Sequence, residues 1–183
     1  MITTECLSDE ALMARFSSES GHGDFSELVR RHQGRMFRVA WNMLGHRRDA
    51  EDAVQECFMR ILGRRRSYHT GTPFSPWAYT ILRYFCIDEL RKRKGHENEV
   101  LEPEILASPD HTDQGVEQRE QDRMVQKALL ELPEDDREVV SLRIYAEMDF
   151  NAISETCKIS PDAAKKRFYR SLEKLKNILK HLL

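Results

Sequence analysis

The segment Pro73–Gly95, with the sequence PFSPWAYTILRYFCIDELRKRKG, predicts a long amphipathic helix with marked ends. Ser75 can cap its start, Pro76 suits the first helical position, and Gly95 suits the exit. Aromatic and aliphatic side chains fill its first half, and four consecutive cations close its second half. We expect the neighbouring helices to pack against its apolar side.

One face of this helix carries cations along its length. The residues that follow steps of three and four are Thr80, Arg83, Ile87, Arg91 and Lys94. A basic face beside aromatic rings has what a protein needs to hold a phosphate backbone and to stack on unpaired bases. The same pattern is typical of a core helix with a solvated basic end, so the helix alone leaves both interpretations open.

The chain before this helix is first acidic and then basic. Asp49 is expected to cap a helix with the sequence DAEDAVQECFMRIL, which Gly63 ends. Acids in its first turn complement the helix dipole, or they form a polar docking surface for another protein. The outward acids and amide of this helix are Glu51, Asp52, Gln55 and Glu56. Arg64–Pro73 then predicts a basic, flexible loop with one aromatic residue, Tyr68.

Two more helices are expected nearer the start. Ser8 can cap a short one, roughly Asp9–Ser20. Asp24, with Glu27 three residues on, resembles a capping box and predicts the start of a long amphipathic helix that Gly45 ends.

The second half begins with a linker and closes with a helix-turn-helix pattern. Gly95–Gly115 has two prolines and few large apolar residues, which predicts little fixed structure. Helices follow over Val116–Leu132 and Glu134–Ala146. Asp149 can then cap a short helix, and Ser160 can cap a long final one that Pro161 starts. A short helix, a turn and a longer helix form the helix-turn-helix layout.

A helix-turn-helix places the beginning of its second helix in the major groove of DNA. Small side chains there allow close approach, and Lys and Arg can reach phosphates or guanine edges. The residues at this beginning are Asp162, Ala163, Lys165, Lys166, Arg167 and Arg170. An ordinary helical hairpin is the competing interpretation.

Charge is distributed unevenly along the chain, although the net charge is only −2. Gly95–Asp122 holds nine acids and one base, and the rest of the chain has 28 bases against 22 acids. Arg60–Lys94 has nine bases against two acids, and Lys158–Leu183 has eight against two. Two basic blocks separated by an acidic tract indicate two cationic surfaces joined by a linker that repels or shields nucleic acid.

The composition suits an all-α protein of 183 residues, 40% hydrophobic and 33% charged, in two small helical domains joined by a flexible acidic linker. No apolar run approaches the roughly 18 residues that a membrane span needs, and the start lacks a signal-peptide pattern. We therefore expect a cytoplasmic protein without membrane insertion. The predicted domains are 1–95 and 116–183, the second with the helix-turn-helix, and the linker is 96–115.

No catalytic or metal-binding constellation is expected. The chain has no glycine-rich phosphate loop, no HExxH and no nucleophile elbow. The four cysteines are far apart and have no CxxC or metal-like spacing. They are Cys6, Cys57, Cys86 and Cys157. Cys57 and Cys86 fall on apolar helix faces, which predicts small buried thiols. We expect no cofactor and no enzymatic activity.

Four stretches of this chain resemble the extracytoplasmic-function sigma factors of the sigma-70 family. DFSELVRRH and DAEDAVQECF are similar to region 2, the segment quoted first is similar to its promoter-melting helix, and Leu129–Lys176 is similar to region 4. The order and spacing of these stretches agree with the family. Tyr84 stands where the family commonly has Asn.

The resemblance implies three sets of site residues. Those that would dock on core RNA polymerase, at the β′ clamp helices, are Asp49, Glu51, Asp52, Gln55 and Glu56. Those that would recognise and open the −10 element are Arg64, Arg65, Arg66, Tyr68, Trp77, Thr80, Arg83, Tyr84, Arg91 and Lys94. Those that would read the −35 element are Ser160, Asp162, Ala163, Lys165, Lys166, Arg167 and Arg170.

The function that the resemblance implies is that of a sigma factor, which directs core polymerase to specific promoters and aids strand opening. Its partners would be core RNA polymerase (β′ clamp helices and β flap), promoter DNA and an anti-sigma factor. A stand-alone helix-turn-helix regulator is the alternative, but it leaves the basic-aromatic helix and its loop without a role. A nucleic-acid-processing enzyme would need a catalytic set, which we do not find. Two basic blocks at a distance favour the sigma factor.

Overall fold

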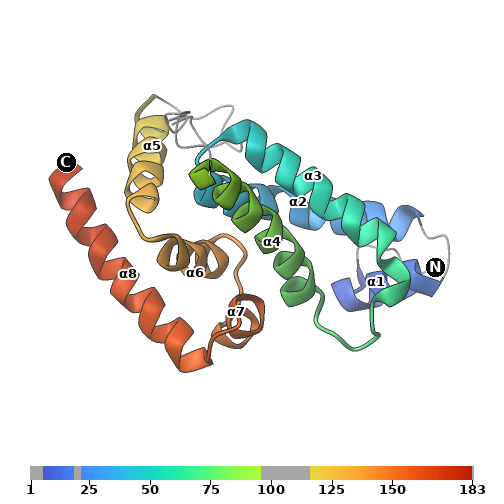
Figure 1. Cartoon of the computed structure of the whole chain (residues 1–183). Helices are drawn as coiled ribbons and strands as arrows, with labels where there is room; N and C mark the ends of the chain where they lie inside the picture. Colours follow the sequence, from blue (N-terminus) through green and yellow to red (C-terminus); the bar gives the residue numbers. More distant parts are fainter. Residues whose placement is uncertain (1–5, 19–21, 96–115, 183) are drawn as a thin grey trace.

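The computed structural model describes residues 6–18, 22–95 and 116–182. Within these ranges the chain is helical and contains no strand, which confirms the all-α prediction (Figure 1). The helices are α1 (Asp9–Ser18), α2 (His22–Leu44), α3 (Arg47–Gly63), α4 (Phe74–Gly95), α5 (Val116–Leu130), α6 (Glu134–Ile144), α7 (Phe150–Cys157) and α8 (Pro161–Leu182), with a 3₁₀ turn, η2, at Arg65–Ser67. The predicted linker over 96–115 lies outside the described residues.

The first half is organised around α2, which packs against α1, α3 and α4. Leu12, Met13 and Phe16 of α1 are buried, and Ser8 Oγ accepts a hydrogen bond from the backbone N–H of Ala11 (3.2 Å) as a helix cap does. The expected cap of the first helix is therefore confirmed.

Three other expected caps are wrong, because α2, α3 and α4 begin one to two residues before the residues that were expected to cap them. Asp24, Asp49 and Ser75 lie in the first turns of these helices. The two carboxylates pair with cations of other helices instead, Asp24 with Arg15 at 3.2 Å and Asp49 with Arg93. The two carboxylates that the local sequence pattern assigned to capping therefore form ion pairs between helices.

The start of α4 is fixed from outside the helix. The backbone N–H of Phe74 donates to Oε1 of Glu10 in α1 (3.1 Å). A free N–H in the first turn of a helix needs such an acceptor, and here another helix supplies it. Likewise Glu27, expected in a capping box, accepts hydrogen bonds from Arg30 and Arg31, which lower its pKa to about 2.

The helix-turn-helix of the second half has the predicted caps. Asp149 accepts a hydrogen bond from the N–H of Ala152 (2.8 Å), and Ser160 Oγ accepts one from the N–H of Ala163 (3.2 Å). Lys158 adopts a left-handed conformation (φ 58°) that turns the chain between α7 and α8. α5 and α6 end two residues earlier than expected, at Leu130 and Ile144.

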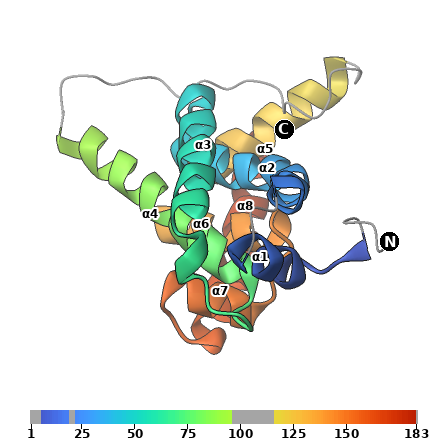
Figure 2. The ribbon, with the colours of Figure 1, turned by 90° about the vertical axis from the view of Figure 1, so that its right-hand side faces the viewer.

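The two halves lie against each other. α6 packs on α2, and α7 packs on α4, so that α4 lies between α3 on one side and the second half on the other (Figures 1 and 2). One hydrophobic core includes Tyr79 and Leu82 of α4 together with Val139, Leu142 and Ile153 of the second half. The sequence pattern gave no indication of this shared core.

Candidate functional site

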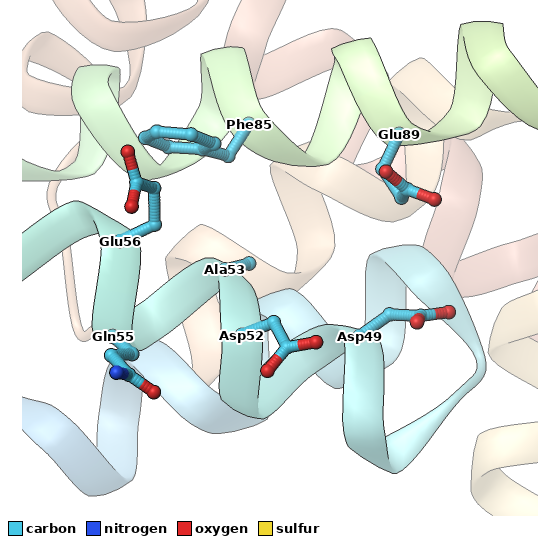
Figure 3. A pocket seen from close by; sticks show the side chains of 7 residues that line it. All are labelled: Asp49, Asp52, Ala53, Gln55, Glu56, Phe85 and Glu89. Atoms are coloured by element: carbon cyan, nitrogen blue, oxygen red, sulfur yellow. The ribbon is translucent and has the colours of Figure 1, made fainter.

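An acidic groove runs between α3 and α4 and has a volume of about 450 Å³ (Figure 3). Its lining residues are Asp49, Asp52, Ala53, Gln55, Glu56, Phe85 and Glu89. Four of the five residues expected to bind polymerase therefore share one surface. Glu51 lies on another side of α3, where it pairs with Arg47 (2.8 Å) and lines a second groove beside Phe37.

The structure adds two residues of α4 to the acidic groove, Phe85 and Glu89. The guanidinium of Arg60 covers the Phe85 ring at 3.9 Å, so that face of the ring is occupied by a cation. Phe85 and Glu89 are four residues apart and therefore share a helix face. That spacing was visible in the sequence, but nothing in the sequence showed that this face borders α3.

The residues expected on the cationic face of α4 have different surroundings. Tyr84 is 51% exposed, and Arg91 and Lys94 are exposed as well. Arg83 is mostly covered, with Nε 2.6 Å from Oε1 of Glu138 in α6. Ile87 packs against the shared core. The first part of this face thus touches the second half of the chain. Its far end is more exposed, although Lys94 Nζ there lies 2.8 Å from Oε1 of Glu134 in α6.

The basic loop before α4 has a defined path. Tyr68 is buried, its hydroxyl donates to the backbone oxygen of Thr72, and its ring meets Trp77 edge-on at 5.1 Å. Burial raises the pKa of Tyr68 to about 12. The Arg65 guanidinium lies 5.6 Å from the Phe16 ring centre. Tyr68 and Trp77 therefore support the loop and expose little ring surface, while Arg64 and Arg66 are exposed.

The residues at the start of α8 that were expected to read the −35 element fall into two groups. Ser160, Asp162, Ala163, Lys165 and Lys166 are exposed, as a reading surface requires. The other two expected cations, Arg167 and Arg170, turn toward α6 instead. Arg167 lies 3.2 Å from Asp135, and Arg170 donates to Oδ1 of Asp136 (2.9 Å).

Asp136 links α6 to α8 by ion pairs. Its carboxylate is 3% exposed and accepts hydrogen bonds from Arg170 (2.9 Å) and Lys174 (2.8 Å). Burial alone would raise the pKa of Asp136, but the hydrogen bonds from Lys174 and Arg170 outweigh it, and the pKa is lowered. Arg170 is thus part of the packing of this half as well as a candidate for DNA contact.

We expect Asp136→Asn to destabilise the protein by about 2 kcal/mol, since hydrogen bonds to charged groups contribute about 1.5–3 kcal/mol. Because the pKa of Asp136 is lower in the folded state, its contribution is present above the ordinary pKa of an aspartate and is lost as pH falls through the folded-state pKa. The measurement is urea denaturation across pH. The gap between wild type and variant should be constant near neutrality and should close in acid. A gap that does not change with pH would contradict the assignment.

Tyr169 is a candidate DNA-contacting residue that the sequence patterns did not single out. Its side chain is 53% exposed, and its ring lies against Phe168 (5.5 Å between centroids) and Phe150 (6.4 Å). It follows Lys165 and Lys166 by four and three residues, so it shares their face of α8. That spacing could have identified it.

Neither a metal site nor a membrane span is found in the part of the chain that the structure describes. No three His, Cys, Asp or Glu side chains come together there as metal ligands would. None of the helices in those ranges has the length and apolar character needed to cross a bilayer. Cys57, Cys86 and Cys157 are buried free thiols, and burial raises their pKa values, which disfavours the thiolate.

Family models match both halves of the chain. The model for Sigma-70 region 2 matches residues 28–96, and the model for Sigma-70, region 4 matches residues 122–175. RNA polymerase sigma factor CarQ of Myxococcus xanthus is 31% identical over 174 residues, which cover 93% of this chain and 97% of CarQ. ECF RNA polymerase sigma factor SigW of Bacillus subtilis is 28% identical over 168 residues, covering 86% of this chain and 90% of SigW.

Two solved structures have the same fold. CnrH, in complex with the cytosolic domain of CnrY, superposes with a TM-score of 0.74 at 22% identity, covering 94% of this chain and 97% of CnrH. The sigma factor RpoE of Bartonella quintana, in complex with the anti-sigma factor NepR, superposes with a TM-score of 0.73 at 23% identity, covering 86% and 97%.

Proposed function

This chain belongs to the extracytoplasmic-function group of sigma-70 RNA polymerase sigma factors, and from that membership we infer how its surfaces divide the work of initiating transcription. As a sigma factor it directs core polymerase to specific promoters and aids strand opening. The observation that carries this conclusion is the order of the two modules, region 2 at 28–96 and region 4 at 122–175. A stand-alone helix-turn-helix regulator would leave the region 2 half unexplained.

Residues 1–95 are the domain that docks on polymerase and opens the −10 element, 116–183 are the domain that reads the −35 element, and 96–115 link them. The acidic groove between α3 and α4 is the docking surface for the β′ clamp helices. It is supported by the exposure of Asp52, Gln55 and Glu56 on its rim and by its carboxylates. An acidic surface requires a basic partner surface, which steers association. The second domain would contact the β flap.

The −10 element is read by the open part of α4 and by the loop before it. Tyr84 offers a ring for a base to stack on, and Arg91, Lys94, Arg64 and Arg66 offer cations for the backbone. Tyr68 and Trp77 act by holding the loop in place, as their edge-on packing supports. Thr80 donates to the backbone oxygen of Pro76 (2.6 Å) and contributes to the same end of α4.

We expect Tyr84→Ala to lower open-complex formation about 5- to 100-fold, because base–aromatic stacking contributes about 1–3 kcal/mol per base. Tyr84→Phe keeps the ring and should retain most of the activity. The measurement is permanganate reactivity of unpaired thymines in holoenzyme–promoter complexes, with helix content checked by circular dichroism. Equal reactivity for the wild type and Tyr84→Ala would show that another group stacks on the opened strand.

An anti-sigma factor is proposed as a further partner. CnrH and RpoE, which share the fold, were each solved in complex with another protein, the cytosolic domain of CnrY and the anti-sigma factor NepR. The cytoplasm is the proposed location, because sigma factors act with the polymerase there. Sigma factors in general are not enzymes, and we propose no reaction catalysed by this chain alone.

The test of the function is co-purification with bacterial core RNA polymerase, followed by run-off transcription from candidate promoters. A stable complex that starts new transcripts is the expected result. Failure to bind core, together with tight and specific binding of duplex DNA by the chain alone, would favour the stand-alone regulator.

A further inference from the structure

The helices α2 and α5 pack against each other and have a small polar cavity between them (Figure 2). Its volume is about 70 Å³, and its lining residues are Arg38, Trp41, Asn42, Asp122, Val125, Gln126 and Tyr145. None of these residues belongs to the surfaces proposed above for polymerase or DNA. On each of the two helices the lining residues follow steps of three and four, so one face of α2 and one face of α5 border the cavity.

Three polar side chains of this cavity are almost completely buried. Gln126 is 2% exposed, Asn42 is 4% exposed and Trp41 is 5% exposed. Within residues 6–18, 22–95 and 116–182, no hydrogen-bond partner is found for either amide atom of Gln126, for Nδ2 of Asn42 or for Nε1 of Trp41. Because both amide atoms of Gln126 are affected, exchanging its oxygen and nitrogen does not remove the deficit. Buried polar groups of native proteins are nearly always hydrogen-bonded, so these atoms require a partner.

Aromatic rings fix the walls of the cavity. Trp41 stacks on Phe37, with 6.1 Å between the ring centroids and 27° between the planes, which sets the direction of the indole N–H. The guanidinium of Arg38 lies over the ring of Tyr145, 5.9 Å from its centroid. A site whose donors are fixed in advance loses little conformational freedom when a ligand binds.

The chemistry of the lining residues favours a small uncharged ligand. Arg38 and Asp122 carry opposite charges, so the wall has no net charge, and a metal ion would find one carboxylate and neither an imidazole nor a thiolate among these residues. An anion would lie against that same carboxylate. Trp41, Asn42 and Gln126 offer N–H donors, while Oε1 of Gln126 and Oδ2 of Asp122 offer acceptors. The ligand must therefore accept and donate hydrogen bonds, as water does.

We propose that the cavity is a binding site for a linked pair of water molecules, which joins α2 to α5 by hydrogen bonds. A volume of about 70 Å³ has room for at least two waters, since each occupies about 30 Å³ in the liquid. A buried water makes about three hydrogen bonds, so two waters that share one bond reach about four protein atoms. In the described part of the chain, five atoms that lack a partner belong to Trp41, Asn42, Asp122 and Gln126.

The direct test is a nuclear Overhauser measurement between water and the indole N–H of Trp41 in the full chain. The chain has two tryptophans, so Trp41→Phe identifies the Trp41 signal by its loss. Rotating-frame spectra separate bound water from chemical exchange, because the two effects have opposite signs there. The Tyr145 hydroxyl, which lies beside Asn42, can relay magnetisation from the solvent, so Tyr145→Phe is measured in parallel. We expect the water peak in both the wild type and Tyr145→Phe.

The second test uses the sign of a change in stability. Gln126→Met keeps the length and the helix propensity of the side chain but removes both amide atoms. With the waters bound, the variant loses two hydrogen bonds, and its melting temperature should fall by about 4–8 °C, or about 2–4 °C for each bond in a chain of this size. Without them, the variant loses two uncompensated polar atoms, and its melting temperature should rise.

The matched control is Gln121→Met, which makes the same change at an exposed position of α5 and should shift the melting temperature by no more than about 1–2 °C. The proposal is overturned if Gln126→Met melts at or above the temperature of this control. It is also overturned if Trp41 shows no water peak, or a peak that Tyr145→Phe removes. The Overhauser result on the wild type decides the matter even if Gln126→Met does not fold. Neither test involves polymerase or promoter DNA, so both are independent of the proposed function.

Discussion

Asp52→Arg is expected to weaken binding to core RNA polymerase on the order of 30-fold or more. Asp52 is exposed on the rim of the acidic groove, in the part that both α3 and α4 border. Truncating one member of a hydrogen-bonded charge pair that the interface buries costs about 2–5 kcal/mol, and reversing its charge adds repulsion. A loss of about 2 kcal/mol corresponds to roughly 30-fold in the dissociation constant.

The measurement is surface-immobilised binding of core polymerase to the wild type and the variant at two salt concentrations. Glu155→Arg, the same change at an exposed acid of α7, is the matched control and should bind as the wild type does. Circular dichroism checks that α3 stays folded, which is expected because Asp52 is exposed. If Asp52→Arg binds core as tightly as the control, the acidic groove is not the docking surface.

Lys165→Ala with Lys166→Ala is expected to weaken binding to duplex −35 DNA about 10- to 100-fold at moderate salt. Both side chains are exposed at the start of α8 and are not among the ion pairs to α6. Each phosphate contact that is lost lowers the salt dependence of binding by about one, so log K against log salt should flatten by about two. The measurement is anisotropy with a labelled duplex from 50 to 300 mM salt, a range of roughly sixfold chosen for this slope.

The control for this pair lies on the same helix. Lys176→Ala with Lys180→Ala removes two exposed cations far from the start of α8 and should leave the slope nearly unchanged. Arg167→Ala is a poorer probe, because Arg167 lies 3.2 Å from Asp135 and its removal would disturb the packing of α6 on α8. Equal losses in the two double variants would mean that the start of α8 is not the reader.

The helices were predictable because their signals are local. The apolar rhythm, the prolines at 133 and 161 and the caps Ser8, Asp149 and Ser160 act within one or two turns, and the structure has each of them as expected. The expected caps Asp24 and Asp49 failed because cations of other helices, Arg15 and Arg93, pair with them. Ser75 failed because α4 begins one residue before it, at Phe74, whose N–H Glu10 accepts. Periodicity shows which face of a helix is apolar, but it does not show which other helix packs against that face.

The site was predictable to the same extent. Glu51, Asp52, Gln55 and Glu56 are exposed as expected, and so are Lys165 and Lys166. Their grouping was not predictable: Glu51 faces away from the groove, while Phe85 and Glu89 enter it from α4. From the sequence, Arg83 and Arg170 were expected to be free cations. In the fold, Arg83 pairs with Glu138 and Arg170 pairs with Asp136, and both acids are distant from their partners along the chain.

The hydrophobic core shared by the two halves has a consequence for how the protein unfolds. Although the chain is composed of two sequence modules, a core that includes Leu82 of α4 and Ile153 of α7 joins them into one cooperative unit. Amides in the middle of α4 and of α7 should therefore exchange with deuterium at the same, global rate in the free protein. A partner that holds the two modules apart would leave each with its own smaller interior, and the bound chain should then be digested more easily than the free chain wherever the partner does not cover it.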